Sequence, residues 1–64
     1  MEDDLGRRML EYRAAHDMSQ EEFAIKARLN VMTVNSIENG KRKPTKLTRM
    51  KIEQIMKEDE QNEI

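Results

Sequence analysis

Residues 18–44 read MSQEEFAIKARLNVMTVNSIENGKRKP and contain the signals that decide the fold. Ser19 and Glu22 form a capping-box pattern, in which the serine hydroxyl accepts a hydrogen bond from the Glu22 amide and the glutamate side chain accepts one from the Ser19 amide. This pattern predicts a helix that begins at Gln20 and ends near Arg28.

A second helix is predicted shortly after the first, over about residues 30–39. Asn30 is a favourable N-cap, and Gly40 can adopt the left-handed conformation that ends many helices. Small or apolar residues at fixed offsets mark the side on which the two helices pack: Phe23, Ala24, Ala27, Leu29, Val34 and Ile37. Because Ala24 is small enough for two helices to cross closely, the stretch predicts a helix-turn-helix arrangement.

Helical spacing of apolar residues continues on the N-terminal side, and the alternation typical of strands is absent. Leu5, Met9 and Tyr12 are spaced to form one buried stripe of a helix over residues 4–15. The fold class is therefore all-α and contains the helix-turn-helix.

A further helix is expected after Pro44, capped by Thr45 and reaching about residue 56 or beyond. Its apolar residues fall on two faces, which are Ile52, Ile55 and Met56 on one and Leu47 and Met50 on the other. Two interpretations stay open: both faces form one wide core stripe, or the second face packs on a second subunit. The acidic tail at 57–64 has almost nothing to bury and is expected to fray.

The composition limits the classes of protein. A chain of 64 residues allows one domain, 1–64, with an expected core of about 5–56. Without cysteine and with His16 as its one histidine, the chain has no disulfide framework and no typical zinc site, and nothing in it implies a cofactor. No segment is apolar enough for a secretory leader or a bilayer span, so we expect a cytoplasmic protein without a membrane partner.

The charge is unevenly distributed. The formal net charge is −1, but residues 5–52 contain eleven Lys and Arg against five Asp and Glu, and both ends are acidic. A basic body with acidic ends is compatible with binding to nucleic acid.

Three short motifs carry a family resemblance: S-Q-E-E before an apolar residue and alanine, T-V-x-x-I-E-x-G, and K-R-K-P. Together they resemble the helix-turn-helix domain of the Xre family, which includes the lambdoid phage repressors and Cro proteins. The resemblance covers roughly residues 5–56. It implies a lambda repressor-like fold, a small bundle of four to five helices, in a prokaryotic or phage protein. The helix at 20–28 would lie across the DNA backbone and the helix at 30–39 in the major groove.

The resemblance assigns base reading to Val31, Met32, Asn35 and Ser36. Val31 and Met32 cannot donate hydrogen bonds and mainly suit thymine methyl groups, whereas Asn35 can pair with adenine and Ser36 can contact a base or a phosphate. We therefore expect an A·T-rich site. The rival interpretation is that two exposed apolar residues mark a protein-binding surface.

Phosphate contacts are implied for Gln20, Lys41, Arg42 and Lys43. Gln20 opens its helix, where backbone amides and the helix dipole favour an anion, and its side chain can bond the same group or a base at the edge of the site. The cations follow the helix end at Gly40 and can fix the register on DNA without reading sequence.

Two further positions concern structure. Arg13 and Glu38 match a family pair in which an arginine of the first helix reaches a glutamate of the third below the surface. Arg28 stands where the family usually has glycine, so the turn either carries strain of roughly 1 kcal/mol or takes a different path.

The leading interpretation is a sequence-specific DNA-binding transcriptional regulator, repressor-like and homodimeric on double-stranded DNA. The alternative is a protein–protein interaction module of the same fold, antitoxin-like or coactivator-like. An enzyme is not expected, because no nucleophile with a nearby base, no phosphate-binding glycine loop and no evident small-molecule site can be found, and no catalytic residue is assigned.

Overall fold

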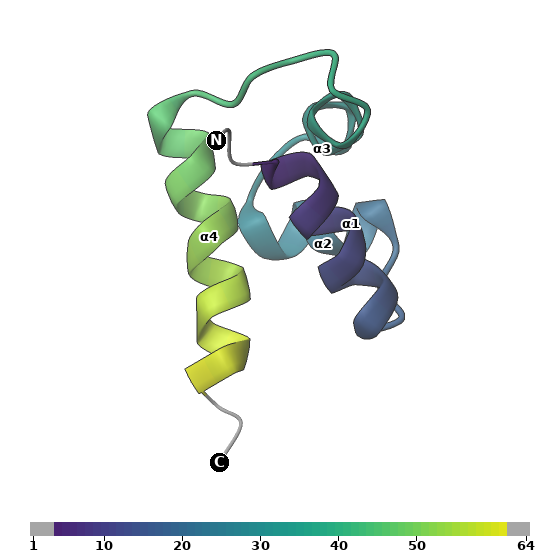
Figure 1. Cartoon of the computed structure of the whole chain (residues 1–64), viewed down its shortest axis with the longest axis vertical. Coiled ribbons are helices and arrows are strands. Elements are labelled where there is room, and N and C mark those ends of the chain that lie inside the picture. Colours follow the sequence, from purple (N-terminus) through teal and green to yellow (C-terminus); the bar gives the residue numbers. More distant parts are fainter. Residues whose placement is uncertain (1–3, 62–64) are drawn as a thin grey trace.

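The computed structural model describes residues 4–61, with side chains as far as Lys57. Within that range the chain forms four helices and no strand (Figure 1). The helices are α1 (Leu5–Ala15), α2 (Gln20–Ala27), α3 (Val31–Glu38) and α4 (Lys46–Gln61). The predicted all-α fold is confirmed, and α4 lies to one side of the group formed by α1, α2 and α3.

The first two helices begin with side-chain caps. The Asp4 carboxylate accepts a hydrogen bond from the Arg7 amide at 3.1 Å and so caps α1. At α2 the predicted capping box is complete, because the Glu22 amide donates to Ser19 Oγ at 3.0 Å and the Ser19 amide donates to Glu22 Oε1 at 2.9 Å. Both caps satisfy amides that have no partner inside the helix.

The other two helices begin in the same way. Asn30 Oδ1 accepts a hydrogen bond from the Met32 amide at 2.7 Å, and Thr45 Oγ1 accepts one from the Thr48 amide at 3.2 Å. Gly40, just beyond α3, has a φ of 72° and so has the left-handed conformation that was expected there. The caps predicted for α3 and α4 are confirmed.

One core joins the four helices. Its buried residues are Leu5, Met9, Phe23, Ala24, Ala27, Val34, Ile37, Ile52, Ile55 and Met56, with Tyr12, Met18, Leu29 and Val31 partly buried against them. The ring of Tyr12 meets Phe23 edge-on, with ring centroids 5.8 Å apart. The inward positions predicted for the helix-turn-helix therefore all contribute to this core.

A close crossing of α1 and α3 depends on Gly6, a residue to which no sequence motif gave a role. A Cβ atom at Gly6 would overlap the carbonyl oxygen of Ile37 and lie 3.1 Å from the Cα of Glu38. Since those atoms belong to the α3 backbone, a side chain here would push the two helices apart.

The turn between α2 and α3 keeps the left-handed conformation although no glycine is present. Arg28 has φ 60° and ψ 46°, and the Leu29 amide donates to the Ala24 carbonyl oxygen at 2.8 Å. The usual path of this turn is therefore present, with Arg28 in the left-handed conformation that carries strain for a residue with a Cβ atom.

The two apolar faces of α4 differ. Ile52, Ile55 and Met56 are buried, whereas Leu47 is 63% exposed and Met50 59% exposed. The interpretation that both apolar faces form one wide core stripe is therefore wrong, because Leu47 and Met50 are exposed to solvent. A single core can bury only the face of a helix that is turned toward it.

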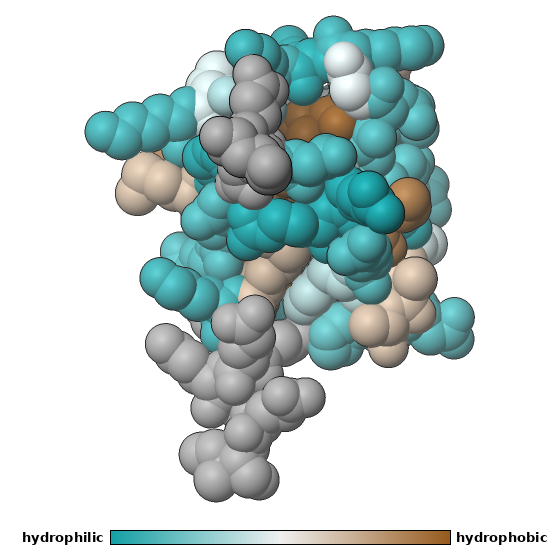
Figure 2. All heavy atoms as spheres, in the orientation of Figure 1, coloured by the Kyte–Doolittle hydropathy of each residue, from teal (hydrophilic) through white to brown (hydrophobic). Residues whose placement is uncertain are grey.

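The acidic tail was expected to fray from residue 57. In the structure α4 continues to Gln61, because residues 57–61 contain no glycine or proline and consist mostly of good helix formers. The remaining expectation, for residues 62–64, lies outside the described residues. Hydrophilic side chains dominate the face of the molecule seen in Figure 2, with apolar surface in small separate areas.

Candidate nucleic-acid interface

The four residues assigned to base reading differ in how far they are exposed on α3. Met32 is 73% exposed and Asn35 is exposed, whereas Val31 and Ser36 are partly buried. Val31 also packs against the core. Met32 and Asn35 are thus the most accessible of the four.

Arg13 and Glu38 come together beneath this helix. Arg13 Nε donates to Glu38 Oε2 at 2.7 Å, and Arg13 Nη2 donates to Glu38 Oε1 at 2.8 Å. A third guanidinium nitrogen, Nη1, donates to the Met18 carbonyl oxygen at 3.0 Å. The Arg13 side chain is 15% exposed and the Glu38 side chain 4% exposed. The two residues thus form a bidentate and mostly buried ion pair that connects α1 with α3.

The ion pair shifts both ionisation equilibria. Burial raises the pKa of Glu38, but the hydrogen bonds from Arg13 and Gln20 and the charge of Arg13 outweigh burial, so the pKa lies below its usual value. The hydrogen bond to Glu38 raises the pKa of Arg13 further above its ordinary value. Both groups are therefore charged at neutral pH.

The Gln20 side chain makes two hydrogen bonds within the protein. Its Nε2 donates to Glu38 Oε1 at 2.9 Å, and its Oε1 accepts a hydrogen bond from Asn35 Nδ2 at 3.3 Å. The side chain is partly buried between the ion pair and the exposed surface of α3. The backbone of Gln20 still opens α2, with the carboxylates of Glu21 and Glu22 in the same turn.

Asn39 is a member of this network that no motif in the sequence had indicated. Its Nδ2 donates to Asn35 Oδ1 at 3.1 Å. Two asparagines four residues apart at the end of a helix lie close enough for such a bond, so their spacing was the available signal. The network then runs from Arg13 through Glu38, Gln20 and Asn35 to Asn39.

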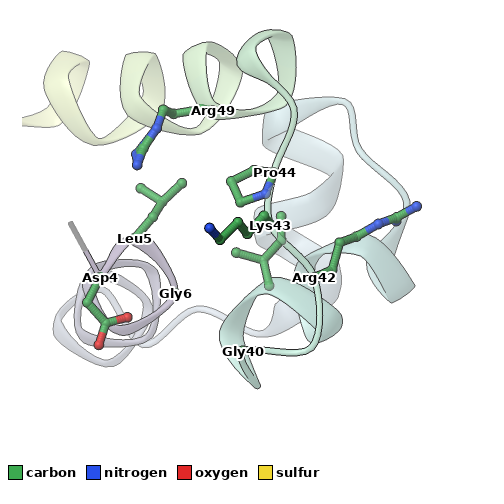
Figure 3. A pocket seen from close by; sticks show the side chains of 9 residues that line it. Asp4, Leu5, Gly6, Gly40, Arg42, Lys43, Pro44 and Arg49 are labelled. Carbon is green, nitrogen blue, oxygen red and sulfur yellow. The ribbon is translucent and has the colours of Figure 1, made fainter. Parts of the chain in front are cut away.

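The cations after α3 are all exposed, but they do not point in one direction. Arg42 Nη1 donates to Thr33 Oγ1 of α3 at 3.3 Å. In Figure 3 the Lys43 side chain extends toward Leu5 while Arg42 extends away on the other side of the chain. Arg42 thus contacts α3, the Lys41 amide donates to the Ser36 carbonyl oxygen at 2.9 Å, and both Arg42 and Lys43 border a hollow.

That hollow is open to solvent and measures about 350 Å³. It is lined by Asp4, which caps α1, by Leu5 of α1, by Lys43 of the segment after α3 and by Arg49 of α4 (Figure 3). Arg49 Nη1 also lies 3.5 Å from Glu53 Oε2. Because both a carboxylate and cations line it, the hollow has no single charge preference.

Other kinds of site were sought in the part of the chain that the structure describes. No group of three or more His, Asp or Glu side chains there is arranged to hold a metal ion. None of the described helices is long and apolar enough to cross a membrane.

Comparison with known proteins gives one match. A family model described as helix-turn-helix matches residues 9–61, which include all of α2, α3 and α4 and most of α1. No curated protein and no solved structure matches the chain with significance.

Proposed function

The chain belongs to the Xre and lambda repressor-like helix-turn-helix family of DNA-binding regulators, and we propose that it is a sequence-specific, repressor-like member that inserts α3 into the major groove. The family is typically non-enzymatic, and we assign no catalytic step. A regulator of this type acts in the compartment that holds the DNA, which we take to be the cytoplasm.

The observation that carries the proposal is the position of the exposed side of α3 beside cations. Met32 and Asn35 project from α3, and Arg42 is hydrogen-bonded to Thr33 of the same helix. With α3 in the groove, Lys41 and Arg42 would lie beside the phosphates that border it. Lys43 then contributes through its charge near the backbone rather than through a contact beside α3.

Base recognition follows from the chemistry of the accessible side chains. Asn35 can pair with adenine through its amide, and Met32 and Val31 can contact thymine methyl groups. Ser36 can bond either a base edge or a phosphate. We therefore propose an A·T-rich site.

We further propose that the protein acts as a homodimer through the exposed start of α4. Leu47 and Met50 lie one helical turn apart and are both more than half exposed. Two copies packed through this face would present two α3 helices to DNA, with half-sites about one helical turn, 34–36 Å, apart.

In vitro selection from random duplexes, repeated at several salt concentrations, tests this function. We expect enrichment of a short A·T-rich half-site that occurs twice, and an affinity that falls steeply as salt rises. Leu47→Lys with Met50→Lys should keep the half-site and lose the pairing. Equal binding to all duplexes would contradict sequence specificity.

The second candidate function is binding to a protein, and the exposed apolar residues favour it. Ile25, Met32, Leu47 and Met50 are between 59% and 77% exposed. An antitoxin-like or coactivator-like module would use such residues as its contact surface. Weak binding to DNA that does not respond to salt would favour this candidate over the first.

A further inference from the structure

The methionines of this chain differ widely in exposure. The sequence has six of them and no cysteine, so thioether sulfur is the only sulfur in it that an oxidant can meet. Met9 is 0% exposed and Met56 8% exposed, whereas Met32 of α3 is 73% exposed and Met50 of α4 is 59% exposed. Among the methionine side chains that the structure describes, Met32 is therefore the one most open to a dissolved oxidant.

Met32 lies at the start of the helix that we propose to enter the major groove. It is the second residue of α3, and its amide donates to Asn30 Oδ1 at 2.7 Å, which fixes the backbone from which the side chain projects. The first residues of a recognition helix are those that meet base edges. The chemical state of the Met32 sulfur thus decides what the start of α3 presents to DNA.

We propose that Met32 is a site of reversible oxidation by peroxide, and that its sulfoxide form lowers the affinity for DNA. This inference rests on the proposed function. A lone pair of the thioether sulfur attacks one oxygen of hydrogen peroxide, and the O–O bond breaks as the S–O bond forms. The second oxygen takes the proton of the first and leaves as water. The sulfur loses two electrons, and the peroxide gains them.

Enzymes that use thiols reverse this change. A methionine sulfoxide reductase removes the oxygen as water while two thiols become one disulfide, and separate reductases act on the two epimers of the sulfoxide. The exposure of Met32 leaves its side chain accessible to such an enzyme when no DNA is bound. Oxidation at this position is therefore a change that can be undone without new protein.

The sulfoxide is a poor neighbour for a thymine methyl group. The thioether is apolar and polarizable, so it can lie against the methyl group. The sulfoxide oxygen is polar, and beside a methyl group it loses water without gaining a hydrogen-bond donor, which costs free energy. Oxidation of Met32 should therefore weaken binding to the A·T-rich site.

Binding of DNA and oxidation of Met32 should oppose each other. With α3 in the groove, the bases would enclose the Met32 side chain and keep peroxide from its sulfur. Peroxide would then act on unbound protein, and the sulfoxide would keep that protein from binding again until it is reduced. Protection of Met32 by DNA is thus a second consequence that can be measured.

The experiment treats the full chain with hydrogen peroxide and maps the sulfoxide at each methionine by peptide mass spectrometry. Affinity is then titrated with a duplex that carries one copy of the selected half-site, so that pairing of two copies does not enter. Met32→Leu cannot be oxidised at that position, and Met50→Leu is the matched control because it removes the other exposed thioether. Each protein is compared with itself before and after peroxide, and the urea midpoint is measured both times to detect unfolding.

We expect Met32 to take up oxygen before Met9 and Met56, and an excess of the duplex to slow its oxidation. Peroxide should lower the affinity of the parent protein and of Met50→Leu by roughly 5- to 150-fold. Sulfoxide reductases with a thiol should restore that affinity. Met32→Leu should have the same affinity before and after peroxide, and the urea midpoints should not change.

Three results would overturn the inference. If Met32 takes up oxygen no faster than Met9 and Met56, it is not a preferred site of oxidation. If the parent protein keeps its affinity with Met32 oxidised, or if Met32→Leu loses affinity as the parent does, the sulfoxide of Met32 does not control binding. These two results leave the proposed function standing. If the untreated parent protein prefers no half-site, the proposed function fails and the inference fails with it.

Discussion

α3 turns Val34 and Ile37 toward the core and Met32 and Asn35 toward solvent. The two faces differ in the property that a substitution should change, which is stability for the inner face and binding for the outer face. On the inner face each side chain is enclosed by other helices, so volume and unpaired charge determine stability. On the outer face Met32 and Asn35 are exposed, and the hydrogen bonds of Asn35 are made at the surface, so the identity of these side chains affects mainly what α3 binds. Variants of the inner face should therefore change folding, and variants of the outer face should change binding.

Arg13→Met should produce the largest effect, on the inner side. It leaves the Glu38 carboxylate mostly buried without its charged partner, which typically costs about 3–5 kcal/mol of stability. Urea unfolding at neutral pH measures the loss. The matched control is Arg7→Met, because Arg7 pairs with Glu11 on the same helix but both side chains are at least 67% exposed. That change should cost roughly 0.5 kcal/mol or less.

A double variant separates unpaired charge from the loss of packing. Arg13→Met combined with Glu38→Leu removes both charges, and stability should recover most of the loss, because buried ion pairs often exchange for apolar residues at little cost. If the double variant does not recover stability, the loss in Arg13→Met comes from the packing of the arginine side chain and not from the unpaired carboxylate.

Gly6→Ala should have the next largest effect on stability. It tests how much stability depends on the close packing of α1 against the inner face of α3. The added methyl group would overlap backbone atoms of Ile37, and overpacking of this kind costs typically about 1–3 kcal/mol. Thermal unfolding should show the loss. Gly40→Ala is an informative counterpart: a Cβ there meets no atom within 4 Å, so its cost of about 1–2 kcal/mol comes from the positive φ alone.

Sequence patterns predicted the helices well because caps are local. The Ser19 box, Asn30, Thr45 and Gly40 act on amides or on the backbone within a few residues, so their effect does not depend on the rest of the fold. The inner residues of the helix-turn-helix were equally predictable, because helical spacing fixes which side chains share a face.

The outer face was harder to predict, because it depends on side-chain rotamers and on contacts between distant segments. No pattern in the sequence indicated that the Gln20 side chain would donate a hydrogen bond to the Glu38 carboxylate, because the two residues lie 18 positions apart on different helices. Leu47 and Met50 were ambiguous, because spacing shows that they share a face and does not show where α4 docks. Gly6 was overlooked since a glycine gives no sign in the sequence of which backbone will approach it.

On the outer side, the largest effect on binding to DNA of any sequence is expected from Lys41→Ala, Arg42→Ala and Lys43→Ala combined. Affinity should fall about 10- to 100-fold, and the slope of log affinity against log salt should flatten by roughly one for each phosphate that is no longer neutralised. The urea midpoint should stay near that of the parent protein, because all three side chains are exposed.

A triple change elsewhere controls for the altered net charge. Lys26 and Lys51 line a hollow between α2 and α4, and Lys57 is exposed farther along α4. Alanine at these three positions removes the same charge but should leave the salt slope nearly unchanged. Equal slopes in the two triple variants would mean that the overall charge of the protein attracts DNA, and that Lys41, Arg42 and Lys43 have no special part in it.

Lowering the pH should reduce the free energy of unfolding gradually. The loss should be smaller than that caused by Arg13→Met, because a protonated Glu38 can still form hydrogen bonds. The folded pKa of Glu38 is lowered, so its contribution is complete above the unfolded carboxyl pKa of about 4.3 and is lost as pH falls through the folded pKa. The measurement is the stability difference between the parent and Glu38→Gln across pH 2–7. A difference that does not shrink in acid would contradict the lowered pKa.

Arg28→Gly should have the smallest effect, and it is the one change expected to stabilise the protein. The left-handed conformation costs a residue with a Cβ about 1–2 kcal/mol, and glycine avoids that cost. Glycine also makes the unfolded chain more flexible, which offsets part of the benefit, so the net gain should be about 0.5–1 kcal/mol.

Arg28→Ala shows whether that gain comes from the backbone or from the side chain. Alanine keeps the Cβ and therefore the strain, while it removes the same exposed guanidinium as glycine does. Stability should then rise for glycine alone. If both variants gain equally, repulsion of the arginine charge is the cause; if glycine loses stability, the turn into α3 is not held in the left-handed conformation. In that case the angle between α2 and α3, on which the separation of the two faces depends, would have to be set by Ala24 and Val34 without the turn.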